Sequence, residues 1–265
     1  MSGIWIILVI IIISALPVIG VYLWFRIAKY QFSLVRFLFV LLAGAAAFIP
    51  ALILQDILTT TSLTQGRMAL LYEFFFRIAF TEEISRLLML IIFYLISGIF
   101  TKPKTDDELS RDNLSRDSLS HDTISHDALS QQPTFNFVKK GTAIGLVAGL
   151  GFALLESARY ASSSMDTFLL LSILRIFSAF PLHAACGSRI GAAVVMFRRY
   201  PTQALLRVIT ATAIHGVYNF LLFMPPGIST AAAILIAISA FIMAILTVRG
   251  GWTNDSTLDK TSENI

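Results

Sequence analysis

Apolar runs about 20 residues long recur along the chain, and they limit its possible folds more than any other feature. A helix of about 20 residues spans the roughly 30 Å of hydrocarbon in a bilayer. Charged residues make up 14% of the chain, against about 25% in soluble domains. We therefore predict an all-α fold, a polytopic transmembrane helical bundle with seven spans. The third and fifth runs exceed 30 residues and leave room for an eighth span. The predicted spans are Ile4–Phe25, Val35–Leu54, Met68–Phe100, Val138–Tyr160, Thr167–Phe197, Gln203–Met224 and Ile228–Val248.

Basic residues predict how the bundle is oriented. Lysine and arginine follow the first, third, fifth and seventh runs, whereas the intervening segments 55–66, 161–166 and 225–227 contain neither. Cytoplasmic loops of membrane proteins carry an excess of these residues. We predict an integral protein of the inner cell membrane with its N terminus outside and its C terminus in the cytoplasm. The net charge of +4 is then explained by basic residues on the cytoplasmic side of the membrane, and no nucleic-acid partner is predicted.

A pentapeptide repeat separates the third run from the fourth. It lies within the loop 101–133, and its units are Glu-Leu-Ser-Arg-Asp, Asn-Leu-Ser-Arg-Asp, Ser-Leu-Ser-His-Asp, Thr-Ile-Ser-His-Asp and a final Ala-Leu-Ser-Gln-Gln. A period of five matches neither a helix nor a strand, and polar low-complexity sequence of this kind is typical of disordered loops. We predict a bundle over residues 1–249, interrupted by a disordered cytoplasmic loop at 101–133. Residues 250–265 are predicted to be a cytoplasmic tail.

The third run contains charged residues in its middle, where each costs roughly 2.5–3.5 kcal/mol. Arg86 lies four residues after Glu82 and three after Glu83, so on a helix it can neutralise either carboxylate. A buried ion pair that orders helix packing is one interpretation. One arginine beside two glutamates leaves a surplus carboxylate, however, and proton chemistry needs such a group whereas packing does not.

Other polar residues occur in the next three runs. Glu156 follows a stripe of glycines spaced four apart in the fourth run, a pattern that lets helices pack closely. His183 lies in the fifth run, and His215 and Asn219 are one turn apart in the sixth. Glu156 could instead be an interfacial glutamate that reaches water, and each histidine could be a core residue whose hydrogen bonds are satisfied. Because lipid offers no polar partners, we predict that these side chains converge.

Several protease chemistries lack the residues that they need. The motif HExxH is absent, and no aspartate lies within a predicted span. Ser178 and Ser188 flank His183, but neither lies in a nucleophile elbow. Cys186 follows His183 by three residues and could pair with it as a nucleophile, although a small buried cysteine is the preferred interpretation.

Glutamate chemistry is the class that the sequence favours. A buried glutamate can activate water as a general base, and a nearby histidine can orient the water or protonate the leaving amine. His215 and Asn219 can donate hydrogen bonds to the oxyanion that forms on the scissile carbonyl. Two histidines with two carboxylates can also hold zinc. Metal-assisted and glutamate-only hydrolysis both stay open at this point.

The motifs resemble those of PrsW-type intramembrane proteases, which belong with the CAAX prenyl endopeptidases and bacteriocin-processing proteins. Glu82-Glu83-Ile-Ser-Arg86 resembles the EExxK/R motif, Phe152–Glu156 matches FxxxE, His183 matches an isolated histidine, and His215–Asn219 resembles HxxxN. The motifs keep the family's order between about residues 72 and 224. This sequence departs from the pattern in its pentapeptide insertion, in arginine at position 86 and in Ser157, where asparagine is common.

The resemblance implies an intramembrane endopeptidase that cleaves membrane-anchored proteins such as anti-sigma factors. Its implied catalytic residues are Glu82 or Glu83 as the water-activating glutamate, together with Glu156, His183 and His215. Asn219 and Arg86 are implied to orient the site or stabilise the oxyanion. An ion, if bound, would be zinc held by His183, His215, Glu83 and Glu156. The implied partners are the lipid bilayer and a protein substrate. From the depth of Glu156 and His215 in their spans, we predict a cavity that opens to the outer side.

Two other function classes stay open. A non-catalytic scaffold or immunity-type relative would tolerate Glu83→Gln without loss of function. A proton-coupled transporter would show internal repeats between its halves, and the two halves of this sequence show no such similarity.

Overall fold

A computed structural model describes residues 3–30, 32–59, 66–97, 126–163 and 167–249. Every element in these ranges is a helix, as the sequence predicts. The elements are α1 (Gly3–Ile27), α2 (Leu34–Ala46), α3 (Phe48–Ile57), α4 (Arg67–Leu71), the π-helix η1 (Tyr72–Phe80), α5 (Thr81–Ile96), α7 (His126–Ser163), α8 (Phe168–Phe177), α9 (Ala179–Met196), α10 (Pro201–Phe223) and α11 (Ile228–Arg249).

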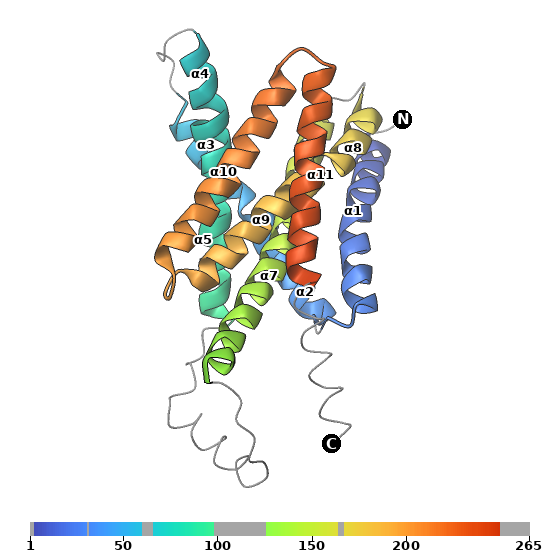
Figure 1. The fold of residues 1–265 in the computed structure, drawn as a ribbon. Coiled ribbons are helices and arrows are strands. Elements are labelled where there is room, and N and C mark those ends of the chain that lie inside the picture. The colour runs from blue at the N-terminus through green and yellow to red at the C-terminus, as the bar shows by residue number, and fades with distance from the viewer. Residues whose placement is uncertain (1–2, 31, 60–65, 98–125, 164–166, 250–265) are drawn as a thin grey trace.

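Helices α7 and α9 pass through the middle of the bundle and pack directly on each other, with the other helices around them (Figure 1). Their contact is made by glycines. A Cβ on Gly145 would lie 2.0 Å from the Gly187 carbonyl oxygen, and one on Gly149 would lie 2.0 Å from the His183 carbonyl oxygen. Small residues let helix backbones touch in this way. The predicted close contact along the glycine stripe is therefore confirmed, and it fixes α9 at the level of His183.

This contact makes Gly149 sensitive to the smallest substitution. Gly149→Ala is expected to destabilise the protein by about 1–3 kcal/mol, because the new methyl group must push the α9 backbone away. Gly20→Ala on α1 is the matched control, since its methyl group would meet nothing within 4 Å. Thermal unfolding of the purified proteins in detergent compares the two variants. Equal unfolding temperatures would contradict this account of the α7–α9 contact.

The long predicted runs are divided in the structure. The second is split into α2 and α3 at Ala47, and the fifth into α8 and α9 at Ser178, whose φ of −123° and ψ of −68° leave the helical region. The third contains the π-helix η1 directly before α5. Helices of this type are rare and are frequently found at functional sites.

Five segments are long and apolar enough to cross a membrane, and they are Leu34–Ile57, Val138–Ser163, Ala179–Met196, Pro201–Phe223 and Ile228–Arg249. Two shorter apolar helices are Ile12–Ile27 and Phe168–Phe177. The structure thus supports an all-helical membrane protein, while the total of seven or eight spans stays a prediction.

The ends of the helices agree with the alternation of basic loops. The α1–α2 connection, the α9–α10 connection and the C-terminal end of α11 lie at one end of the bundle, the lower end in Figure 1. These are the places where arginine and lysine follow the apolar runs. The orientation in the cell stays a prediction.

The predicted pentapeptide loop and the tail fall largely outside the described residues. Residues 98–125 and 250–265 are not described. Helix α7 already begins at His126, seven residues before the predicted end of the loop at 133. Ala128, Leu129 and Gln131 in this stretch are good helix formers, so the sequence can extend α7 into the repeat.

Candidate active site

All but one of the polar side chains singled out in the sequence meet inside the bundle. Glu82 and Glu83 are at the start of α5, Glu156 is on α7, His183 on α9 and His215 on α10. Each is buried, with exposed fractions of 3%, 0%, 8%, 2% and 1% in that order. Four helices that are distant in the sequence therefore contribute to one polar cluster, and the lack of polar partners in lipid accounts for this convergence.

Glu83 is held by two neighbours. Arg86 Nη1 donates to both of its carboxylate oxygens, at 2.7 and 2.9 Å, and His215 Nδ1 lies 2.8 Å from Glu83 Oε1. A carboxylate paired with a guanidinium acts as an acceptor, so His215 donates from Nδ1. In the neutral ring, the lone pair is then on His215 Nε2, on the side away from Glu83.

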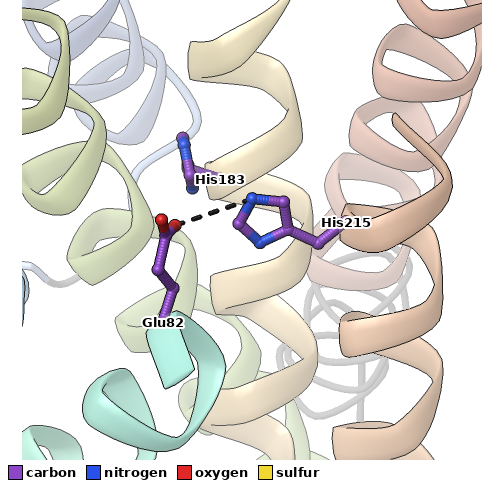
Figure 2. A group of neighbouring side chains, drawn as sticks. All are labelled: Glu82, His183 and His215. Carbon is purple, nitrogen blue, oxygen red and sulfur yellow. Dashed lines mark ion pairs between the residues drawn. The ribbon is translucent and has the colours of Figure 1, made fainter. Parts of the chain in front are cut away.

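Glu82 has one satisfied oxygen and one that is not. Gln55 Nε2 donates to Glu82 Oε1 at 3.1 Å. Glu82 Oε2 is buried without a hydrogen-bond partner, 3.6 Å from His215 Nε2 and 3.8 Å from Arg86 Nη2. Figure 2 shows the Glu82 carboxylate directed toward the two histidine rings. A buried polar atom without a partner is costly, so this oxygen marks a place suited to water, a cation or substrate.

His183 takes part in a second chain of polar contacts. Arg86 Nη2 lies 3.0 Å from His183 Nδ1, and Glu156 Oε2 lies 2.6 Å from His183 Nε2. Because a guanidinium only donates, Nδ1 accepts, and the proton of the neutral ring is on Nε2, which donates to Glu156. The two histidine rings are perpendicular, with centroids 5.0 Å apart. Arg86 therefore links the Glu83–His215 pair to the His183–Glu156 pair.

Two residues of the cluster were missed in the sequence. Arg175 on α8 donates to Glu156 Oε2 at 2.5 Å and to Ser157 Oγ at 2.8 Å, so Ser157 keeps a polar contact although it replaces the commoner asparagine. Arg175 could have been found in the sequence, since an arginine inside a predicted span needs a polar partner. Gln55 carried none, because it follows the predicted end of the second span and its role depends on where α3 packs.

Phe152 of the FxxxE motif packs inside the cluster. The Arg86 guanidinium lies 4.4 Å from the centre of its ring, and the His183 ring centroid lies 5.2 Å from it. A cation over an aromatic face is favourable. The aromatic residue thus contacts the two side chains that link both halves of the cluster.

Asn219 lies apart from these bonds. It is half-buried, one turn beyond His215 on α10. Within the described ranges, no hydrogen bond joins its side chain to the cluster. The structure thus brings together every predicted site residue except Asn219, whose amide has no partner in the cluster.

The alternative nucleophiles are bound elsewhere. Ser178 Oγ donates to the Leu174 carbonyl oxygen, Ser188 Oγ to that of Ala185, and Cys186 Sγ to that of Ala211. Each bond lies within a helix or between α9 and α10, and His183 has both ring nitrogens engaged with other partners. The interpretation of Cys186 as a small buried residue is confirmed.

A divalent ion fits part of the cluster. Glu82, His183 and His215 each offer one ligand atom, and these atoms lie within 4.8 Å of one another. One carboxylate oxygen with imidazole nitrogens is a set that zinc uses. The structure groups Glu82 with the histidines in place of the predicted Glu83 and Glu156, whose oxygens accept hydrogen bonds from arginine and histidine.

Comparison with known proteins agrees with this site. A family model described as PrsW family intramembrane metalloprotease matches residues 33–247, a range that includes every residue of the cluster. Neither the curated proteins nor the solved structures give a match. With its apolar helices and a match over most of its length, the chain belongs to the PrsW family of intramembrane metalloproteases.

Proposed function

We propose that the protein is an endopeptidase that hydrolyses peptide bonds of membrane-anchored proteins with water activated at Glu82. The observation that carries this proposal is the unpartnered Glu82 Oε2, buried 3.6 Å from His215 Nε2. A general base needs a free oxygen within reach of water. Glu82 has one, whereas both oxygens of Glu83 accept bonds from Arg86. The geometry therefore favours Glu82 over Glu83 as the base.

Glu83 and Arg86 act through His215 in this proposal. The Nδ1–H···Oε1 bond of 2.8 Å orients the ring and leaves Nε2 facing Glu82. A carboxylate behind a histidine is the usual support for a ring whose other nitrogen binds a metal or moves a proton. Arg86 neutralises the Glu83 charge without occupying the Nε2 side of the ring.

The chain's residues also fit a metal ion, which the word metalloprotease in the family's name implies. Glu82 Oε2 and His215 Nε2 are suitable ligand atoms for a metal ion, because the first lacks a hydrogen-bond partner and the second carries a lone pair. His183 would be the third ligand, and binding through Nε2 would require the loss of the proton that this nitrogen donates to Glu156. A divalent ion such as zinc, when bound, polarises the scissile carbonyl and makes water more acidic. Two states of the site thus differ in the role of Glu82: without an ion Glu82 is the base, and with one Glu82 would be a ligand and Glu156 the remaining carboxylate beside His183.

The second polar chain supplies the other groups that hydrolysis needs. Without an ion, His183 carries its proton on Nε2, where it can be passed to a leaving amine. Arg175 holds the Glu156 carboxylate against this nitrogen. The Asn219 amide, one turn beyond His215 and outside the hydrogen-bonded cluster, is available to stabilise an oxyanion.

We infer that the substrate reaches the cluster from within the membrane. The cluster lies among four helices and is buried by apolar side chains, so a substrate held in the bilayer is the class that it suits. Single-pass proteins such as anti-sigma factors fit this class. We further propose that access opens toward the outer side of an inner membrane, with the C terminus in the cytoplasm.

Metal content and cleavage measured on the same samples test the proposal. The purified protein, reconstituted with single-pass substrates, is expected to bind about one zinc and to cut the substrate at one mapped position. Chelation should remove both properties, and added zinc should restore both. His215→Ala should lose the zinc, whereas Glu73→Gln, which alters a half-exposed acid on η1, should keep it.

The outcomes separate the possibilities. Cleavage that survives complete removal of the metal would assign hydrolysis to the glutamates alone. Bound zinc without cleavage of any substrate would contradict the endopeptidase and indicate a non-catalytic relative.

A further inference from the structure

A second polar site lies between α9 and α10, outside the active-site cluster. It is a cavity of about 340 Å³ lined by Arg189, Gln203, Leu206, Arg207 and Thr210. Arg189 follows His183 by six residues on α9, and Arg207 precedes His215 by eight on α10. The cavity therefore lies toward the end of the bundle where the basic α9–α10 connection is found (Figure 1).

The two arginines of the cavity have no acidic partner. In the ranges that the structure describes, neither Arg189 nor Arg207 forms an ion pair, and Arg189 Nη1 donates to the carbonyl oxygen of Ala185 at 3.0 Å. The sequence explains this, since no aspartate or glutamate occurs between residues 167 and 249. Both side chains are half-buried, and unpaired cations in a membrane protein are expensive. An anion between the two guanidiniums would relieve this cost.

The surroundings of the cavity indicate the kind of anion. Leu206 lines it, and Leu205 and Ile209 lie on the adjoining surface of α10, with exposed fractions of 55%, 57% and 53%. This helix is long and apolar enough to span a membrane, so the exposed face suits acyl chains. A soluble anion would fill only the basic cavity, whereas a phospholipid would occupy both the cavity, with its headgroup, and the apolar face of α10, with its acyl chains.

We propose that this cavity binds the phosphate headgroup of an anionic phospholipid whose acyl chains lie along α10. Basic pockets between helices near the cytoplasmic surface are suited to such headgroups. Gln203 supplies a neutral donor beside the two guanidiniums. The lipid joins α9 to α10, the two helices that carry His183 and His215, so it stabilises their contact without touching either histidine.

Lipid retention by the full-length protein tests the site. Wild type and an Arg189→Gln/Arg207→Gln double variant are titrated with phosphatidylglycerol in phosphatidylcholine nanodiscs, and bound lipid is measured by native mass spectrometry with thermal unfolding in parallel. The double variant is expected to bind phosphatidylglycerol about 25-fold more weakly, from about fivefold for each arginine. Arg198→Gln is the control for loss of a basic residue outside the cavity, because it removes one positive charge from the exposed connection.

Further variants and additions keep the test decisive. If the glutamine variants fold poorly, Arg189→Lys and Arg207→Lys take their place. These variants preserve the charge and are expected to keep most of the lipid binding. Equal retention by wild type and the double variant, or equal loss in Arg198→Gln, would overturn the proposal. Equal protection by inorganic phosphate in pure phosphatidylcholine would assign the cavity to a soluble anion. Protection only by an acidic peptide would assign it to a protein partner.

Discussion

Glu82→Gln is expected to lower kcat/KM for substrate cleavage by about 10²–10⁴-fold, the usual contribution of a positioned general base. The substitution keeps the shape of the side chain and its contact with Gln55, but it removes the carboxylate that faces His215. The new amide can donate toward His215 Nε2, which lies 3.6 Å from the present oxygen. A buried charge is also lost, so the unfolding temperature should stay the same or rise. Cleavage of a reconstituted substrate and thermal unfolding measure the two effects.

The control for this prediction is Glu73→Gln. Glu73 pairs with Arg77 on η1 and is 34% exposed, so its loss should leave cleavage unchanged. Cleavage by Glu82→Gln within about twofold of wild type would remove Glu82 from the mechanism. A matching fall in unfolding temperature would instead indicate a structural role.

Arg86→Met is expected to destabilise the protein by about 3–5 kcal/mol, the range found when one partner of a buried ion pair is removed. Arg86 and Glu83 are both 0% exposed. Without the guanidinium, Glu83 loses both bonds from Nη1, and His183 Nδ1 loses its donor. Denaturant unfolding in detergent, together with the abundance of the variant in membranes, measures the loss.

A double-mutant cycle shows whether the cost comes from the unpaired charge. Arg86→Met combined with Glu83→Gln should be more stable than Arg86→Met alone, because no uncompensated carboxylate is left. Arg86→Lys, which keeps the charge, should recover part of the stability. Strictly additive effects in the cycle would contradict the assignment of Arg86 as the partner of Glu83.

The sequence alone determined the class of the molecule and most of its polar cluster. Apolar runs set the helices, because only a chain with its backbone bonds satisfied internally is stable in lipid. The same medium explains why Glu82, Glu83, Glu156, His183 and His215 could be expected to meet. The spacing of Arg86 also predicted its pairing with a glutamate, since residues three and four apart share a helix face.

The tertiary structure alone decided how partners are distributed within the cluster. Glu82 and Glu83 are neighbours in the sequence, yet one keeps a free oxygen and the other has none. Arg86 is close enough in sequence to pair with either one, and it binds both oxygens of Glu83. Distant residues accompany this choice, because His183, 97 residues beyond Arg86, contacts its Nη2, and His215, 132 residues beyond Glu83, binds the same carboxylate. Helical periodicity relates residues within a few turns of one helix. Which donor reaches which oxygen depends on how separate helices pack. The glycine contacts between α7 and α9, for example, bring the helix of Glu156 against the helix of His183.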